Sequence, residues 1–104
     1  MQEPTFLILT ALAAGPQHGY GIMTDVAQIS AGRVRLRAGT LYAALDRLGE
    51  EGQLEFDHEE IVDNRLRRYY RITRAGAERL AEEADRLRAN ANAALTRLRP
   101  GVAI

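Results

Sequence analysis

Residues 39–48 read Gly-Thr-Leu-Tyr-Ala-Ala-Leu-Asp-Arg-Leu, and this stretch decides how the rest of the chain can be arranged. Four apolar side chains recur in it at helical spacing and predict one inward-facing stripe, formed by Leu41, Ala44, Leu45 and Leu48. The opposite side carries small and polar residues, with Tyr42 at its edge. We therefore predict a helix from about Gly39 to Glu51, with Thr40 placed to cap or open it.

Two helices are predicted before this stretch. Pro4 suits the first position of a helix that continues to Ala14 and ends at Gly15-Pro16. This helix is apolar nearly all round, which in so small a chain indicates burial by a second subunit. A second helix is predicted over about His18 to Ser30. Tyr20, Met23, Val26, Ala27 and Ile29 recur in it at helical spacing.

The apolar period changes from helical to alternating after Gly52. One strand is indicated by Leu54 and Phe56, and whether Ile61 belongs to it is left open. A second strand is indicated by the alternation of residues 67–72. Asp63-Asn64 is the turn signal between the strands. The pattern predicts a two-stranded hairpin with a long, charged tip.

The last predicted helix begins after Thr73 as N-cap and ends near Leu98. An apolar seam runs along it with alternating spacings of three and four, at Ala77, Leu80, Ala84, Leu87, Ala91, Ala94 and Leu98. A helix of about 25 residues is roughly 37 Å long, more than the other elements can cover. We expect a homodimer, with packing on the first helix of the same chain as the alternative. The predicted interface residues are Phe6, Leu9, Leu80, Ala84, Leu87, Ala91, Ala94 and Leu98.

Composition limits the classes of function. The 104 residues suffice for one domain with a single core, and 46% of them are hydrophobic. The absence of cysteine excludes disulfides and thiolate metal sites. No apolar run reaches about 18 residues and the first residues carry no basic signal, so we expect a cytoplasmic protein without a membrane partner. No nucleophile triad, phosphate loop or carboxylate pair stands out, so we expect neither an enzyme nor a cofactor or metal site.

Charge is unevenly distributed along a chain whose net charge is zero. All 14 basic residues are arginines; four lie in residues 33–47 against one acid, and five lie in residues 65–74 against none. Residues 50–63 carry seven acids and no base, and we expect them on the first strand, turned away from any nucleic acid. Arginine suits phosphates and guanine edges. The basic blocks therefore indicate a nucleic-acid partner, with plain solvated charge as the alternative.

The order of elements, three helices, a hairpin and a long helix, is that of a winged helix-turn-helix followed by a dimerisation helix. This fold is mainly α with a small β-hairpin (α+β). We predict a DNA-binding domain over residues 1–74, a dimerisation helix over 75–99 and a tail over 100–104. The third helix offers Thr40, Ala43 and Arg47 to a major groove, and the hairpin tip offers Arg65, Arg67 and Arg68 to phosphates.

Three segments resemble the short form of the PadR family of bacterial transcriptional regulators. They are residues 12–22, which include His-Gly-Tyr-Gly-Ile; residues 39–48; and residues 65–73 together with Gly76. The resemblance implies a dimeric winged-helix repressor that binds an inverted-repeat operator, commonly also its own promoter. It places Tyr20, Thr40, Tyr42, Arg65 and Arg67 at the DNA.

Several alternatives stay open at this stage. Tyr20 contacts a phosphate or caps the core, and Arg37, like its neighbours Arg33 and Arg35, contacts phosphates or is simply solvated. The resemblance leaves room for a small hydrophobic effector between the subunits. The absence of tryptophan puts in doubt the aromatic sandwich by which some short members hold flat molecules. A function of another class is a protein-interaction module that uses the same fold without DNA.

Overall fold

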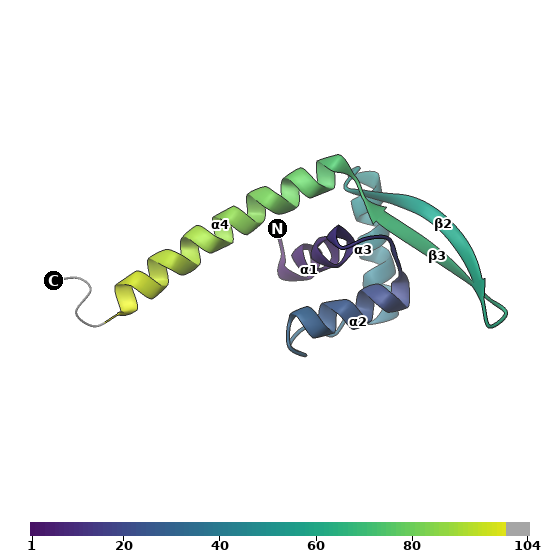
Figure 1. Ribbon diagram of the computed structural model, residues 1–104, viewed down its shortest axis with the longest axis horizontal. Coiled ribbons are helices and arrows are strands. Elements are labelled where there is room, and N and C mark those ends of the chain that lie inside the picture. The colour runs from purple at the N-terminus through teal and green to yellow at the C-terminus, as the bar shows by residue number, and fades with distance from the viewer. Residues whose placement is uncertain (100–104) are drawn as a thin grey trace.

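The computed structural model describes residues 1–99, which form four helices and a three-stranded sheet (Figure 1). In chain order the elements are α1 (Glu3–Ala13), β1 (Gln17–His18), α2 (Gly19–Ile29), α3 (Ala38–Glu50), β2 (Leu54–Val62), β3 (Arg65–Ile72) and α4 (Arg74–Leu98). The predicted α+β fold, a winged helix-turn-helix followed by a long helix, is confirmed. The predicted tail lies outside the described residues.

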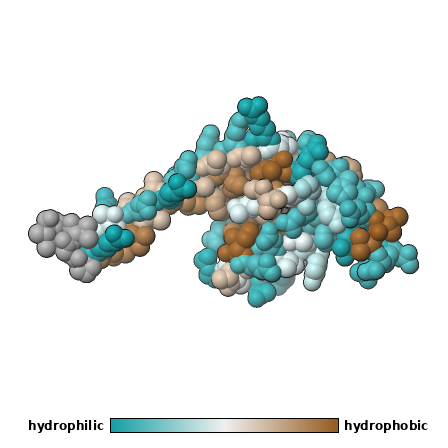
Figure 2. Space-filling view, viewed as in Figure 1, coloured by the Kyte–Doolittle hydropathy of each residue, from teal (hydrophilic) through white to brown (hydrophobic). Residues whose placement is uncertain are grey.

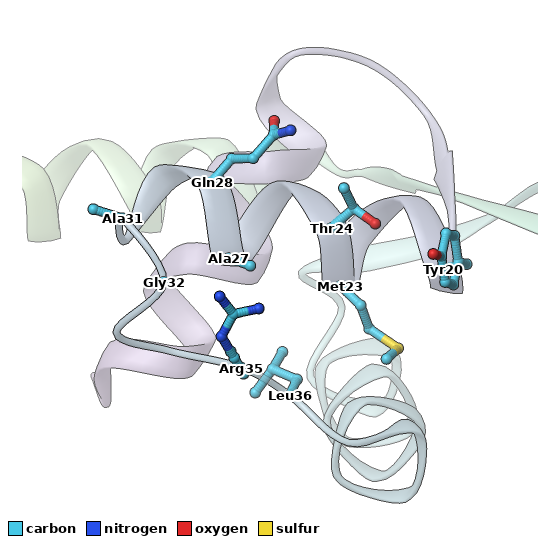
Figure 3. Close-up of a pocket in the computed structure, with 9 residues that line it drawn as sticks. All are labelled: Tyr20, Met23, Thr24, Ala27, Gln28, Ala31, Gly32, Arg35 and Leu36. Atoms are coloured by element: carbon cyan, nitrogen blue, oxygen red, sulfur yellow. The ribbon is translucent and has the colours of Figure 1, made fainter.

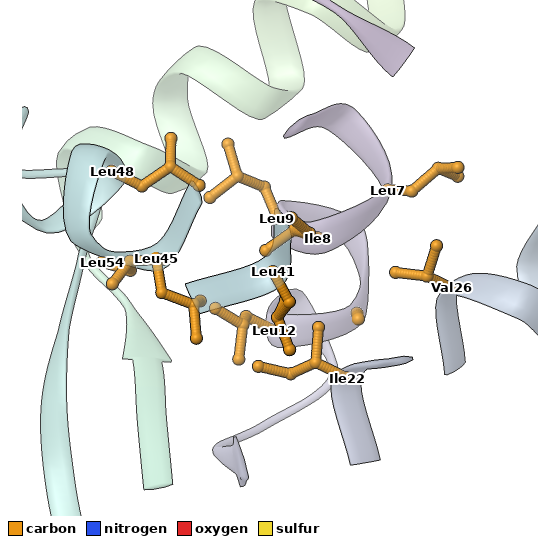
Figure 4. Packing of buried hydrophobic residues seen from close by; sticks show 11 residues of the cluster. Leu7, Ile8, Leu9, Leu12, Ile22, Val26, Leu41, Leu45, Leu48 and Leu54 are labelled. Atoms are coloured by element: carbon orange, nitrogen blue, oxygen red, sulfur yellow. The ribbon is translucent and has the colours of Figure 1, made fainter. Parts of the chain in front are cut away.

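The core lies among α1, α2, α3 and the start of the hairpin (Figure 4). From α3 it takes Leu41, Leu45 and Leu48, so the stripe predicted for this helix is confirmed. From α2 it takes Ile22 and Val26. Two residues of the helical pattern predicted for α2 lie outside the core, because Tyr20 is 72% exposed and Ile29 is 43% exposed.

Helix α1 is covered almost entirely within its own chain. Leu9 is fully buried in the core, so its prediction as a subunit-interface residue is wrong. The helix is apolar nearly all round because α2, α4 and β3 all pack against it (Figure 1). Phe6 remains half-buried on the side of α4.

Helix α3 begins without the cap that was expected. Arg37 is its N-cap and makes no side-chain capping hydrogen bond, and Thr40 lies inside the first turn with an exposed side chain. The prediction of Thr40 as a cap is therefore wrong. The cap predicted for α4 is right, because the Thr73 hydroxyl accepts a hydrogen bond from the Gly76 amide at 3.0 Å.

Strands β2 and β3 form the predicted hairpin, called the wing below. Asp63 and Asn64 have φ values of 51° and 61°, the left-handed pair that a two-residue hairpin turn requires. A bulge between Phe56 and His58 shifts the register of β2. The short strand β1 pairs with β3 at Tyr69 and Tyr70, giving the order β1-β3-β2. This third strand was not expected, because a strand of two residues leaves no alternation in the sequence.

Helix α4 has a covered half and an uncovered half within the single chain. Leu80 and Ala84 are half-buried, and Leu80 packs on the core. Beyond Leu87, which is 40% exposed, the helix leaves the body of the molecule and exposes Leu95 and Leu98 (Figures 1 and 2). Among residues 1–99, no helix combines the length and the apolar character needed to cross a membrane.

Candidate nucleic-acid interface

A groove of about 510 Å³ opens between the wing and the amino-terminal ends of α2 and α3. We call it the wing groove; its lining residues are His18, Gly19, Tyr20, Tyr42, Arg65, Leu66, Arg67 and Arg68. Strand β1 covers β3 only at two residues, so residues 65–68 present an open strand edge to the groove. The groove thus combines the N-terminus of α2, aromatic rings and arginine side chains.

Tyr42 projects from α3 onto the first residue of α2. A methyl group built on Gly19 would lie 2.5 Å from the Tyr42 hydroxyl and 3.0 Å from the adjacent ring carbon. The absent side chain of Gly19 therefore leaves the room in which the Tyr42 ring lies, and any larger residue would displace the end of that ring. Tyr42 remains 48% exposed, so one side of the ring is free for a ligand.

Tyr20 joins the wing groove to a second groove along α2. This second groove has a volume of about 550 Å³ and is lined by α2 and by the loop that leads to α3 (Figure 3). Figure 3 shows Arg35 reaching from that loop toward Gly32, and Met23 and Leu36 lying between α2 and the loop. Because Tyr20 lines both grooves, it marks the centre of a surface that continues from the wing to Arg35.

The arginines of the wing face acids across the hairpin. Arg67 is the register partner of Glu60, and Arg68 is the partner of Glu59. The same register places Arg65 opposite Val62, so this cation has no acid directly across the ladder. Acids paired in this way reduce the field that the wing presents, and Arg65 is the wing cation least affected.

The last wing arginine is held at the base of the hairpin. The Arg71 guanidinium donates to Glu55 at 2.9 Å and to Asp57 at 3.1 Å. The expectation that the acidic block lies on the first strand holds in part: four of the seven acids lie on β2, whereas Glu50 and Glu51 lie at the end of α3 and Asp63 lies in the turn. The four acids of β2 are not simply turned away, because they bind or face the arginines of β3.

Two histidines lie on either side of Tyr69. The His58 ring stacks on Tyr69 with ring centroids 4.4 Å apart, and His18 lies at 5.2 Å. Hydrogen bonds to Asp57 and Glu60 raise the pKa of His58 above its ordinary value. Burial, and then the charge of Arg67, lower the pKa of His18.

The predicted site residues do not all come together. Tyr20, Tyr42, Arg65 and Arg67 line the wing groove. Thr40 and Arg37 are exposed at the start of α3. Arg47 lies elsewhere, because its guanidinium donates to the Thr5 hydroxyl at 3.0 Å.

Three lining residues of the wing groove were not among the predicted contacts. His18 belongs to the two-residue strand β1, which has no sequence signal of its own. Gly19 lines the groove as the first residue of α2. Leu66 could have been found from its position two residues after the turn signal, where a large apolar side chain is unusual.

Residues 8–82 match the model of the transcriptional regulator PadR-like family. The chain belongs to this family. The resemblance predicted from the three sequence segments is thereby confirmed, as is the predicted class of function, a transcriptional regulator. A relative of this PadR-like chain, an uncharacterised 37.1 kDa protein of a Streptomyces fradiae transposon, is 45% identical over 82 residues. The match covers 79% of the chain but only 22% of that relative.

Solved structures show the same fold at low sequence identity. A PadR family transcription regulator from Clostridium difficile has a TM-score of 0.76 at 22% identity, with 94% of this chain and 100% of that one covered. Bacillus subtilis PadR, solved in complex with operator DNA, has a TM-score of 0.70 at 21% identity, with 80% of this chain and 47% of that one covered.

Proposed function

We propose that this PadR-like regulator is a repressor that binds an inverted-repeat operator in double-stranded DNA, its own promoter included. The observation that carries the proposal is the wing groove, where Tyr20, Tyr42 and the wing arginines meet beside the start of α3. The outer residues at that start, Thr40 and Ala43, are small enough to enter a major groove about 12 Å wide. The solved complex of a family member with operator DNA supports the same partner.

Each contact has a role that follows from its chemistry. The N-terminus of α2 opens on the wing groove, and helix N-termini attract phosphates. Tyr20 is exposed at that end and contacts the backbone. Arg65, and more weakly Arg67 beside Glu60, contacts phosphates next to the groove, while Thr40 and Tyr42 contact base edges. Arg37 contacts phosphates from the loop before α3. Arg47 is not part of the proposed contact, because it is bonded to Thr5.

The operator-binding unit is a homodimer through residues 75–99, with residues 1–74 as the DNA-binding domain. Support comes from the seam of α4. In the outer half of this helix, large apolar side chains are exposed, and the described part of the chain does not cover them. The proposed contacts are Phe6, Leu80, Ala84, Leu87, Ala91, Ala94 and Leu98. Two wings then lie on one duplex, and the two half-sites follow the twofold symmetry of the protein.

A small hydrophobic effector is proposed for the cavity of about 280 Å³ between α1 and α4. Its lining includes Phe6, Leu7 and Leu87, with Arg33 and Glu83 at its polar side. A molecule bound there changes the angle of α4 and so the distance between the two wings, which lowers operator affinity. The protein acts in the cytoplasm, without a catalytic step or a cofactor.

A protein-interaction module is the second candidate. The observation that favours it is the pairing of wing cations with acids across the hairpin, which lowers the positive field of the wing. The two functions differ in one property, the affinity for duplex DNA.

Two measurements on the purified chain test the proposal. An electrophoretic shift with the duplex upstream of its own gene should show binding that a scrambled duplex of equal length does not match. Equal retention of both duplexes, or of neither, would contradict the proposal that the protein binds an operator upstream of its own gene.

The dimer is tested by sedimentation of variants. Leu87→Asp should produce monomer or aggregate, because it places a charge in the seam. Arg88→Asp, one position off the seam, is the control that should remain dimeric.

A further inference from the structure

The tip of the wing carries two large aliphatic side chains that the fold itself does not use. Ile61 is 77% exposed and Leu66 is 61% exposed, and the two are direct partners across the hairpin. Figure 2 shows apolar surface at the end of the wing, surrounded by hydrophilic atoms. Hairpin tips are usually polar, so this pair needs a reason other than folding.

Both side chains belong to one face of the wing. Residues at alternate positions share a face, so Leu66 lies on the side of Arg68, Tyr70 and Ile72. The bulge between Phe56 and His58 keeps Ile61 on that same side of β2. At the base of the wing this face joins the core, so the aliphatic pair extends the core-facing surface outward.

The aliphatic pair also continues the wing groove. Leu66 lines that groove together with Tyr20 and Tyr42. Any duplex that contacts Tyr20 and the start of α3 therefore passes the wing tip. Arg65 follows the turn on one side of the pair, and Arg68 lies over the Phe56 ring at 4.9 Å on the other.

We propose that Ile61 and Leu66 pack against the deoxyribose walls of the minor groove and make the wing sensitive to a guanine amino group there. This inference rests on the proposed operator-binding function and deepens it. Deoxyribose presents C–H groups between phosphates, which suits an aliphatic pair flanked by arginines, and apolar side chains enter minor grooves in other DNA-binding proteins. A G·C pair adds the N2 amino group of guanine to the groove floor, which A·T pairs lack. A protein partner for so small a patch is the competing outcome.

The experiment uses the full chain and a duplex selected from a random-sequence pool for tight binding. Hydroxyl-radical footprinting, which reports on the accessibility of deoxyribose, locates the sugars protected by the wing. Leu66→Ser should restore cleavage at those sugars and weaken binding by about three- to tenfold for each wing. The slope of log affinity against log salt should stay unchanged, because no phosphate contact is lost.

Base analogues separate the minor groove from the major groove. At the sugars protected by the wing, replacing A·T by inosine·cytosine changes the major-groove edge and adds no amino group to the minor groove. Wild-type protein should bind this duplex as before and bind the G·C duplex more weakly. In Leu66→Ser the difference between the two duplexes should disappear.

Two variants control for indirect effects. Leu66→Met keeps an apolar side chain of similar length and should bind like wild type. Ile29→Ser removes an exposed aliphatic group at the far end of α2 and should leave the footprint unchanged. If wild type binds the duplex and Leu66→Ser matches it in footprint and affinity, the inference is overturned while the proposed function stands. If wild type binds no duplex, the proposed function itself fails.

Discussion

Helix α3 and the wing meet at the same groove but are built in opposite ways. Helix α3 is fixed by three core leucines, Leu41, Leu45 and Leu48, each no more than 2% exposed. The outer half of the wing has no such anchor, because β1 reaches only Tyr69 and Tyr70 and the tip exposes Ile61 and Leu66. Cross-strand pairs hold the wing together instead.

This difference suits two tasks in recognition. Base edges must be met by side chains whose positions are fixed to within a fraction of an ångström, and α3 supplies them from a helix locked in the core. Phosphates and sugars follow the local shape of the duplex, and a hairpin of two strands can adjust to it. We therefore expect changes in α3 to affect sequence choice in the major groove, and changes in the wing arginines to affect general affinity.

Replacing a leucine by alanine in α3 and in the wing should give the largest difference between the two regions, in the free energy of unfolding. Leu45→Ala removes a buried side chain and should lower the free energy of unfolding by about 2–5 kcal/mol. Leu66→Ala removes one that is already exposed and should lower it by less than about 0.5 kcal/mol. Urea unfolding of both variants measures the contrast. A similar loss for both would mean that the wing tip is packed in solution.

Tyr42→Ala should produce the next largest effect, on binding alone. If the ring meets a base edge or a thymine methyl, the variant should lose about 1–3 kcal/mol on operator and little on random DNA. Fluorescence anisotropy with both duplexes measures the two losses. An equal loss on both would assign Tyr42 to the backbone instead.

Most of the fold follows from patterns that extend over several residues. The stripe of α3, the two-residue turn at Asp63 and Asn64, and the Thr73 cap each have a strong local signal, and the structure contains all three. Strand β1 and the buried position of Leu9 were missed for different reasons. The strand is too short to show a period, and an all-round apolar helix does not reveal which neighbour covers it.

The site was less predictable, because it depends on contacts between distant segments. The motif residues Tyr20, Tyr42 and Arg65 could be found from sequence, and they do line one groove. The pairing of wing arginines with acids depends on the register of β2, which the bulge after Phe56 shifts by one residue. Nor does the sequence show that Arg47 turns toward Thr5.

Gly19→Ala should have a smaller effect on binding, and it tests the contact between Gly19 of α2 and Tyr42 of α3. The new methyl group would displace the Tyr42 hydroxyl, which is the far end of a flexible side chain, so stability should change by less than about 0.5 kcal/mol. Operator affinity should fall by part of the Tyr42→Ala loss. Adding Tyr42→Phe removes the displaced hydroxyl and should recover most of the binding. A double variant as weak as Gly19→Ala alone would reject this packing as the cause.

The smallest effect should be a pH dependence of the wing. His58 has a raised pKa, so its contribution to stability is present below its ordinary value of 6.5 and is lost as pH rises through the raised value. Its partners Asp57 and Glu60 have lowered pKa values, so their contribution is lost only in acid. As the pH rises from 6.5 through the raised pKa of His58, wild type should therefore lose a little more thermal stability than His58→Gln. Melting curves that shift equally would exclude a contribution of His58 and its two acids to the stability of the wing.

The salt dependence of binding tests most directly whether the wing groove meets a DNA backbone. Arg65→Ala removes one phosphate contact per subunit, so in a dimer the slope of log affinity against log salt should become shallower by about 2. The loss should be the same on operator and random DNA. Arg88→Ala on α4, an exposed arginine far from the wing groove, is the matched control and should leave the slope unchanged. An unchanged slope for Arg65→Ala would contradict the account.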